Sequence, residues 1–236
     1  MVKENLAFCF EKIRISAAKA GNSSPGAVLI AVTKGVALEF IETAIDNGVT
    51  HIGENKIQEA LLKFDRVNAY AKRKGVHLSW HMIGHLQTNK TKDAVRMFDL
   101  IHSVDSVHLA KEIDKEAAKL GKVQDVLLEV KTSSEATKFG FLPSEIEANV
   151  PLLAALKNLK VKGLMTMAPF FDDPQKTRPY FKKLKDLSDA IFVHGPWTMD
   201  HRPVLSMGMT DDFEIALEEG ATMVRLGRAI FGERQS

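Results

Sequence analysis

The sequence predicts an α/β fold: a single TIM-type (β/α)8 barrel that spans residues 1–236 and carries an extra N-terminal helix. Buried apolar runs alternate with helical patterns, eight such runs are present, and no linker or low-complexity tract divides the chain. An open doubly wound sheet is the alternative. It would need a phosphate-binding glycine loop after the first strand, where the chain has Thr33-Lys34-Gly35-Val36.

The first segment has the pattern of an amphipathic helix, with an apolar stripe of Leu6, Cys9, Phe10 and Ile13. Cys9 is the only cysteine, which excludes an intrachain disulfide and a multi-cysteine metal site. We interpret Cys9 as a core thiol rather than a nucleophile, and a reducing compartment suits this use of cysteine.

The strand order begins after a Gly/Ser/Pro break at 21–26, where the apolar run 27–32 predicts a first strand buried on both faces. A helical pattern over 36–45 and a second strand at 50–53 follow. The same order returns near the C-terminus, where a short helix leads into a last strand at 222–226.

Five further strands are predicted between these two units. They are expected near 81–83, 100–104, 126–131, 161–167 and 204–207. Helical patterns separate most of them, at 107–120, 144–159 and 174–190.

The composition is that of an ordinary globular protein, with 45% hydrophobic and 26% charged residues. Thirty-two Lys and Arg against 30 Asp and Glu leave a net charge of +2, and no basic cluster suggests a nucleic-acid partner. No apolar stretch approaches the roughly 20 residues that a membrane span needs. We therefore expect a cytoplasmic protein with neither a nucleic-acid nor a membrane partner.

Lys34 follows the first strand directly. In a barrel of this type the C-terminal ends of the strands form the open face, so this lysine is expected at the rim of the pocket. Desolvation there is expected to lower its pKa and leave a neutral fraction that can attack an aldehyde. The alternative is a lysine that reaches solvent or pairs with a carboxylate.

The last two strands carry the second signal. Ser206 ends the seventh strand, and the eighth ends in Arg225-Leu226-Gly227-Arg228. Loops after strands 7 and 8 often bind phosphate in barrels, and Gly227 allows close backbone approach. By strand alternation Arg225 is expected to point into the pocket; an outward Arg225 paired with a helix carboxylate is the alternative. Each piece alone is weak, since glycines after strands usually mark turns, but together they suggest a ligand with an aldehyde and a phosphate.

Seven segments, in order along nearly the whole chain, resemble the signatures of the YggS/PROSC family: AVTK (31–34), GENKIQE (53–59), WHMIGHLQTNK (80–90), SEATKFG (134–140), GLM (163–165), LSMGMTDD (205–212) and TMVRLGRAIFG (222–232). The departures from the family pattern are small. Thr33 and His85 replace residues more often found in those motifs, and Gly35 stands where bulkier residues are common.

The resemblance implies an alanine racemase N-terminal-domain-like barrel that holds pyridoxal 5′-phosphate (PLP) as an internal aldimine on Lys34. Ser206, Gly227 and Arg228 would bind the phosphate, Arg225 would face the pyridine nitrogen, and Asn55 would lie beside the cofactor. The cofactor-binding set that we expect is Lys34, Asn55, Ser206, Met207, Arg225, Gly227 and Arg228, with no catalytic residue and no metal.

The expected function is PLP homeostasis: binding of the cofactor for storage or for delivery to apo PLP-dependent enzymes. An arginine opposite the pyridine nitrogen keeps its proton, so the ring is a poorer electron sink than one paired with a carboxylate. Similar racemases take a tyrosine from a C-terminal β domain. The chain ends at Ser236, four residues past Gly232, so we expect no such domain, and Tyr70 and Tyr180 lie in predicted helices.

Three other functions stay open. A weak PLP-dependent amino-acid racemase is the nearest, and a Schiff-base aldolase would also use a lysine and a phosphate site. A metal-dependent hydrolase would use His81 and His85, but their i,i+4 spacing aligns ligands only on a helix, and the segment is predicted to be a strand that runs into a loop. We expect a monomer, with a dimer as the alternative. Lys90 and Lys138 match the family motifs without a role that the residues explain.

Overall fold

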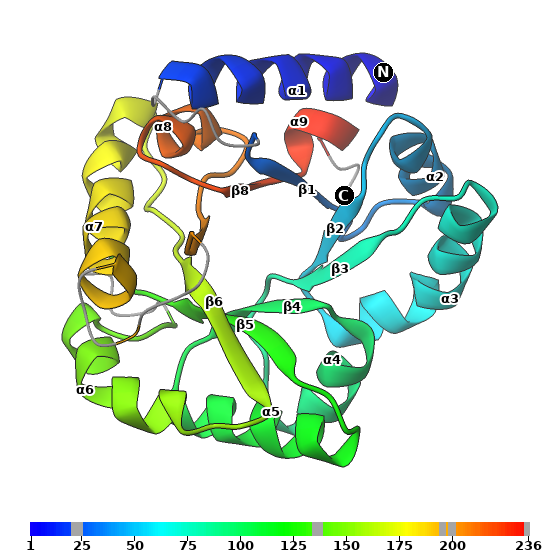
Figure 1. Cartoon of the computed structure of the whole chain (residues 1–236). Coiled ribbons are helices and arrows are strands. Elements are labelled where there is room, and N and C mark those ends of the chain that lie inside the picture. Colours follow the sequence, from blue (N-terminus) through cyan, green and yellow to red (C-terminus); the bar gives the residue numbers. More distant parts are fainter. Residues whose placement is uncertain (20–25, 134–138, 194–196, 198–201, 234–236) are drawn as a thin grey trace.

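Eight parallel strands close into one barrel, in the order β1 to β8, in the computed structural model of the chain (Figure 1). The structure describes residues 1–19, 26–133, 139–193, 197 and 202–233. The strands are β1 (Val28–Val32), β2 (His51–Glu54), β3 (Ser79–Met82), β4 (Leu100–Val104), β5 (Gln124–Glu129), β6 (Leu159–Met165), β7 (Val204–Ser206) and β8 (Met223–Leu226). The barrel predicted from the sequence is confirmed.

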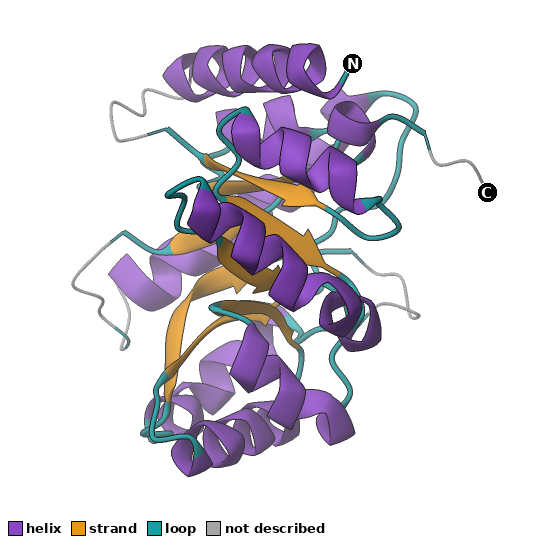
Figure 2. Ribbon diagram, turned by 90° about the vertical axis from the view of Figure 1, so that its right-hand side faces the viewer, coloured by secondary structure: helices purple, strands orange, loops and turns teal. Residues whose placement is uncertain are grey.

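Helices cover the outside of the barrel, as the side view in Figure 2 shows. They are α1 (Val2–Lys19), α2 (Leu38–Asp46), α3 (Ile57–Arg73), α4 (Thr91–Met97), α5 (Val107–Lys119), α6 (Pro143–Ala154), α7 (Arg178–Ser188), α8 (Phe213–Glu218) and α9 (Arg228–Phe231). Three shorter turns complete the order: η1 (Thr88–Lys90), η2 (Pro174–Thr177) and η3 (Asp189–Val193). Within these described residues no helix is both long and apolar enough to cross a membrane.

The extra N-terminal helix, α1, packs against α2, α8 and α9 over the seam where β8 meets β1 (Figure 1). Leu6, Cys9 and Ile13 are buried, as predicted. Phe10 is 38% exposed, so its place in the apolar stripe was wrong. It follows Cys9 by one residue, about 100° further around the helix, and faces away from the barrel.

The predicted helix over 144–159 was too long at its C-terminal end. α6 ends at Ala154, because the chain must turn there to enter β6. The N–H of Asn158 donates to Asp114 Oδ1 at 2.7 Å, and Leu159 already pairs with Gln124 of β5.

The barrel interior has an apolar layer below and polar groups above it. Leu100, Leu127 and Met165 pack together, with Val204 and Met223 against them, while the residues that alternate with them belong to the larger core under the helices. This apolar layer belongs to the lower, N-terminal part of the barrel. The polar groups described below lie above it, toward the C-terminal ends of the strands.

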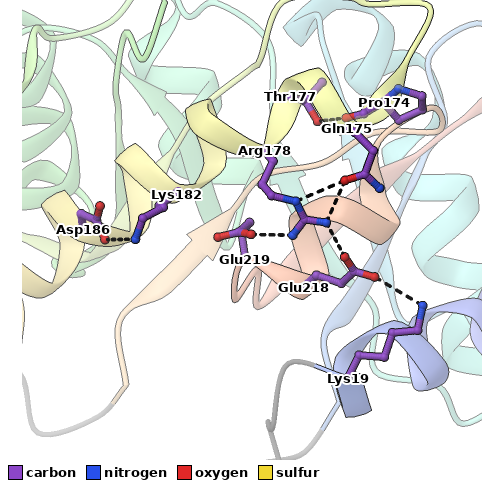
Figure 3. A network of polar contacts seen from close by, with 9 residues as sticks. All are labelled: Lys19, Pro174, Gln175, Thr177, Arg178, Lys182, Asp186, Glu218 and Glu219. Carbon is purple, nitrogen blue, oxygen red and sulfur yellow. Dashed lines mark hydrogen bonds and ion pairs between the residues drawn. The ribbon is translucent and has the colours of Figure 1, made fainter.

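Arg178 joins two of the outer helices to each other (Figure 3). Its guanidinium donates to Glu218 at the end of α8 and to Glu219, the next residue, each at 2.6 Å, and Lys19 of α1 reaches Glu218 at 3.4 Å. The two carboxylates raise the pKa of Arg178. The network thus connects α1, α7 and α8 on the side of the barrel that carries the last two strands.

Candidate functional site

A cavity of about 430 Å³ opens at the C-terminal ends of β1 and β8. Its walls come from β1, from the loop after β7 and from the end of β8. The lining residues are Val32, Lys34, Met209, Thr210, Asp211, Arg225, Gly227, Arg228 and Glu233. The fold therefore brings together four residues of the predicted set, Lys34 with Arg225, Gly227 and Arg228, from opposite ends of the chain.

Lys34 reaches this cavity through the alternation of β1 and its extension. Val32 and Lys34 line the cavity, whereas Thr33 between them turns outward, toward the helices. Gly35 follows with φ of 67°, a left-handed conformation that glycine adopts without strain and that turns the chain away from the strand. The lysine side chain is half-buried at the rim.

A buried cluster holds the backbone on both sides of Lys34. Lys63 of α3 donates from Nζ to the carbonyl oxygen of Thr33 at 2.8 Å, and to Glu54 and Glu59, each at 2.9 Å. The hydroxyl of Thr33 donates to Glu54 at 2.5 Å, and the N–H of Gly35 donates to Glu59. Burial raises the pKa of Glu54, while the bonds from Thr33 and Lys63 oppose that rise.

Arg225 is the buried cation of the site. Its Nη1 donates to the carbonyl oxygen of Ser206 at 2.9 Å and to Ser206 Oγ at 2.6 Å, and its Nη2 donates to the carbonyl oxygen of Thr166 at 3.0 Å. Burial lowers the pKa of Arg225 to about 10, and the carboxylates of Glu129 and Asp212 limit the fall. The guanidinium is therefore charged at neutral pH and held by three hydrogen bonds beside the cavity.

Three histidines continue from Ser206 through the barrel interior. Ser206 Oγ lies 2.9 Å from His102 Nδ1, His102 Nε2 lies 2.9 Å from His81 Nδ1, and His81 Nε2 lies 2.9 Å from His51 Nδ1. Burial lowers the pKa of His81 to about 3 and that of His102 well below its usual value. The sequence analysis considered His81 only beside His85, because the contact between His81 and His102 is made across neighbouring strands.

Glu129, at the end of β5, is a second group that the sequence analysis missed. It is 5% exposed, and burial raises its pKa to about 7, with a further upward contribution from Asp105 and opposing ones from Arg225 and Lys131. A carboxyl group that ends a strand at the open face of a barrel was the available signal.

The hydroxyl that lines the cavity with Gly227 and Arg228 belongs to Thr210, while Ser206 is not among the lining residues. Thr210 lines the cavity, and its Oγ1 accepts from the N–H of Ala229 at 3.3 Å. Ser206 is fully buried beneath Arg225, and its hydroxyl is already bonded to Arg225 and His102. Thr210 lies four residues beyond Ser206, in the same segment that signalled a phosphate loop.

Met207 and Asn55 lie away from the cavity. Met207 is fully buried in the core beneath the helices, and its N–H donates to Met223 at 3.1 Å. Asn55 lines a separate cavity of about 380 Å³ between the loops after β2 and β3, together with Lys56, His85 and Lys90. Their roles toward a cofactor stay predictions.

His81 and His85, which the sequence singled out as possible metal ligands, have separate partners. His85 pairs with Asp105 at 3.1 Å and stacks on Phe139, whereas His81 faces His51 and His102 inside the barrel, so this pair does not form the ligand set of a hydrolase. Lys138 lies outside the described residues.

The comparisons with known proteins agree with the sequence resemblance. The family model of the alanine racemase N-terminal domain matches residues 10–235. The chain is similar to the pyridoxal phosphate homeostasis protein of Aquifex aeolicus, with 41% identity over 98% of both chains. The same-named protein of Synechocystis is 39% identical over 89% of this chain and 93% of that protein.

Solved structures extend the likeness to three dimensions. The structure of PipY from Synechococcus elongatus with PLP bound has a TM-score of 0.84 and 33% identity, and the match covers 98% of this chain and all of PipY. An alanine racemase from Clostridium difficile has a TM-score of 0.67 at 16% identity and is covered over 57% of its length. That second likeness concerns the fold alone.

Proposed function

The chain belongs to the family of pyridoxal phosphate homeostasis proteins, and from this premise we propose a function. We propose that the protein binds PLP at Lys34 and holds the cofactor for storage or delivery. One observation carries the proposal: Lys34 and the segment Arg225–Arg228 line a single cavity. Its volume of about 430 Å³ falls within the range of roughly 300–1,000 Å³ that is usual for small-molecule sites.

The residues present fit each part of PLP. Lys34 supplies a primary amine for the aldehyde, and Arg225 supplies a charged, immobilised guanidinium for the pyridine nitrogen. We assign the phosphate to Thr210, to the backbone at Gly227 and to Arg228, whose guanidinium now pairs with Asp211. In this assignment Ser206 acts on the cofactor through Arg225.

The covalent step needs only Lys34. Lys34 would hold the cofactor through Nζ, a primary amine of the kind that condenses reversibly with an aldehyde and releases water. PLP, when bound, supplies an electron sink. Arg225 keeps its proton at neutral pH and would donate to the ring nitrogen, not protonate it, so the site would favour holding the cofactor over carbanion chemistry.

The positions of the tyrosines also favour storage over racemisation. Two-sided proton transfer at a substrate carbon needs a second acid–base group beside the lysine. Tyr70 donates to Asp46 at 2.8 Å on the outside of the barrel, and Tyr180 packs on Phe171 at 5.9 Å between ring centroids. Neither tyrosine lines the cavity that holds Lys34.

The proposal also covers the oligomeric state of the protein, its location and the transfer of PLP. We assign the whole chain, 1–236, to one cofactor domain, a monomer in the cytoplasm that passes PLP to apo PLP-dependent enzymes. The buried free thiol of Cys9, whose pKa burial raises to about 11, supports a reducing compartment. A lysine that holds an aldehyde would also suit transfer, because such a bond can be hydrolysed or exchanged with another amine.

The test is an absorbance spectrum of the purified protein with PLP, followed by borohydride reduction and peptide mapping. We expect a visible band in the wild type, its loss in Lys34→Ala and its retention in Lys56→Ala, a matched change of an exposed lysine in the other cavity. The reduced adduct should map to Lys34. An adduct on another lysine, or trapping of a sugar phosphate by a colourless protein, would overturn the proposal.

A further inference from the structure

The guanidinium of Arg225 lies at one end of a continuous chain of hydrogen bonds through the barrel. From Arg225 the chain passes to Ser206, then to His102 and His81, and finally to the half-buried ring of His51. All four links measure 2.6–2.9 Å, and Ser206 and His102 are fully buried while His81 is 2% exposed. These side chains lie on β2, β3, β4, β7 and β8, so the chain spans the barrel.

The direction of the donors follows from Arg225. A guanidinium only donates, so Ser206 Oγ accepts from it, and the one hydroxyl hydrogen of Ser206 needs another acceptor. His102 Nδ1, 2.9 Å from Ser206 Oγ, provides that acceptor. A neutral imidazole that accepts at Nδ1 carries its hydrogen on Nε2, so His102 donates onward from Nε2.

The same step repeats at each ring. His102 Nε2–H meets His81 Nδ1, which places the hydrogen of His81 on Nε2, and that hydrogen meets His51 Nδ1. The reverse direction would give Ser206 Oγ two donors and leave its own hydrogen without an acceptor among the contacts of the described side chains. Each ring must also be neutral, because a second ring proton would place two N–H groups face to face.

We propose that Ser206, His102, His81 and His51 form a one-way hydrogen-bond chain whose direction Arg225 sets, and that Ser206 and His102 are positioning residues that hold Arg225 against the cofactor ring. The second half of this statement rests on the proposed function. The chain does not conduct protons, because it ends at a guanidinium that keeps its proton at neutral pH. Its role is to keep the Arg225 plane in one orientation.

The first test uses the protein without PLP and reads the histidine tautomers by ¹⁵N NMR of a histidine-labelled sample. We expect His51, His81 and His102 to carry hydrogen on Nε2 at neutral pH. Ser206→Ala should give mixed tautomers at His102 and His81, because it removes the donor that sets the direction. His51→Phe cuts the far end and should leave His102 in the Nε2–H form.

The asymmetry between the two cuts decides the question. Fixed tautomers in Ser206→Ala combined with lost ones in His51→Phe would mean that the far end sets the direction, and would overturn the chain as proposed. The variant His102→Asn interrupts the chain at the next residue and keeps Ser206. It should loosen the orientation of the Arg225 guanidinium as Ser206→Ala does.

The second test measures binding of PLP and of pyridoxal, which lacks the phosphate. If Ser206 acts through Arg225, Ser206→Ala should raise the dissociation constants of both ligands roughly tenfold, as expected when one charged hydrogen bond is lost. A loss for PLP alone would show that Ser206 binds the phosphate, and unchanged affinities would remove the positioning role. Failure of the wild type to bind PLP at Lys34 would instead contradict the proposed function and leave the tautomer result standing.

Discussion

Lys63 Nζ donates to the carbonyl oxygen of Thr33 at 2.8 Å, so that a buried ammonium holds the residue immediately before Lys34. The same ammonium bonds the carboxylates of Glu54 and Glu59, and Glu59 in turn accepts from the N–H of Gly35. The backbone around Lys34 is therefore held by a second lysine, Lys63, which is only 7% exposed.

Replacing Lys63 with Met should destabilise the fold by about 3 kcal/mol, because Glu54 would remain fully buried without its cation. The double variant Lys63→Met with Glu54→Gln should regain a large part of this loss, since it removes the unpaired carboxylate as well. Urea unfolding of the two variants and the wild type measures both effects. A single variant as stable as the wild type would contradict the role assigned to the cluster.

Removing the hydroxyl of Thr210 should weaken phosphate binding specifically. Thr210→Val is expected to raise the dissociation constant of PLP about tenfold and to leave that of pyridoxal unchanged, because pyridoxal has no phosphate. Thr43→Val, which removes an exposed hydroxyl on α2, is the matched control. Spectroscopic titration gives both constants, and an equal loss for the two ligands would move Thr210 away from the phosphate.

Glu129 should make stability fall as the pH rises. Its pKa is about 7 in the folded protein against 4.5 for an ordinary glutamate, so the folded state binds more protons between these values. The contribution is favourable below pH 4.5 and is lost by pH 7, an effect of about 3 kcal/mol at most. The free energy of unfolding of Glu129→Gln, measured in urea, should therefore rise relative to that of the wild type between pH 5 and pH 8. A constant difference across that range would place the pKa elsewhere.

The histidine chain should act in the opposite direction. The folded pKa of His81 is about 3 against an ordinary 6.5, and that of His102 is also depressed, so the unfolded state takes up more protons below pH 6.5. Each ring then costs about 1.4 kcal/mol per pH unit as the pH falls toward 3. Burial also lowers the pKa of His51; the charge of Asp99 opposes this fall and that of His77 adds to it.

Thermal or urea unfolding between pH 4 and pH 7 measures this slope. The variant His102→Asn should reduce the slope by the contribution of one proton taken up on unfolding. The control variant His108→Asn, which changes an exposed ring on α5, should keep the wild-type slope. The expectation fails if both variants keep the wild-type slope.

The outline of the site was predictable from local pattern. Strand alternation and the position of the strand ends place Lys34, Arg225 and Gly227 at the open face of a barrel, and no other information is needed for that step. The phosphate role of Ser206, which was expected from the loops after the last two strands, stays a prediction, because local pattern does not say how deep a residue lies. The structure places Ser206 beneath Arg225 and leaves Thr210 at the cavity wall.

The sequence by itself determined the eight-strand order, the extra first helix, and the placement of Lys34 and Arg225 at the same end of the barrel. These features depend on periodicity along the chain. Only the tertiary structure decided which side chains meet across the barrel. Lys63 reaches Thr33 from a helix, and His51, His81 and His102 align from three strands, because barrel closure brings together residues whose spacing in sequence carries no sign of contact.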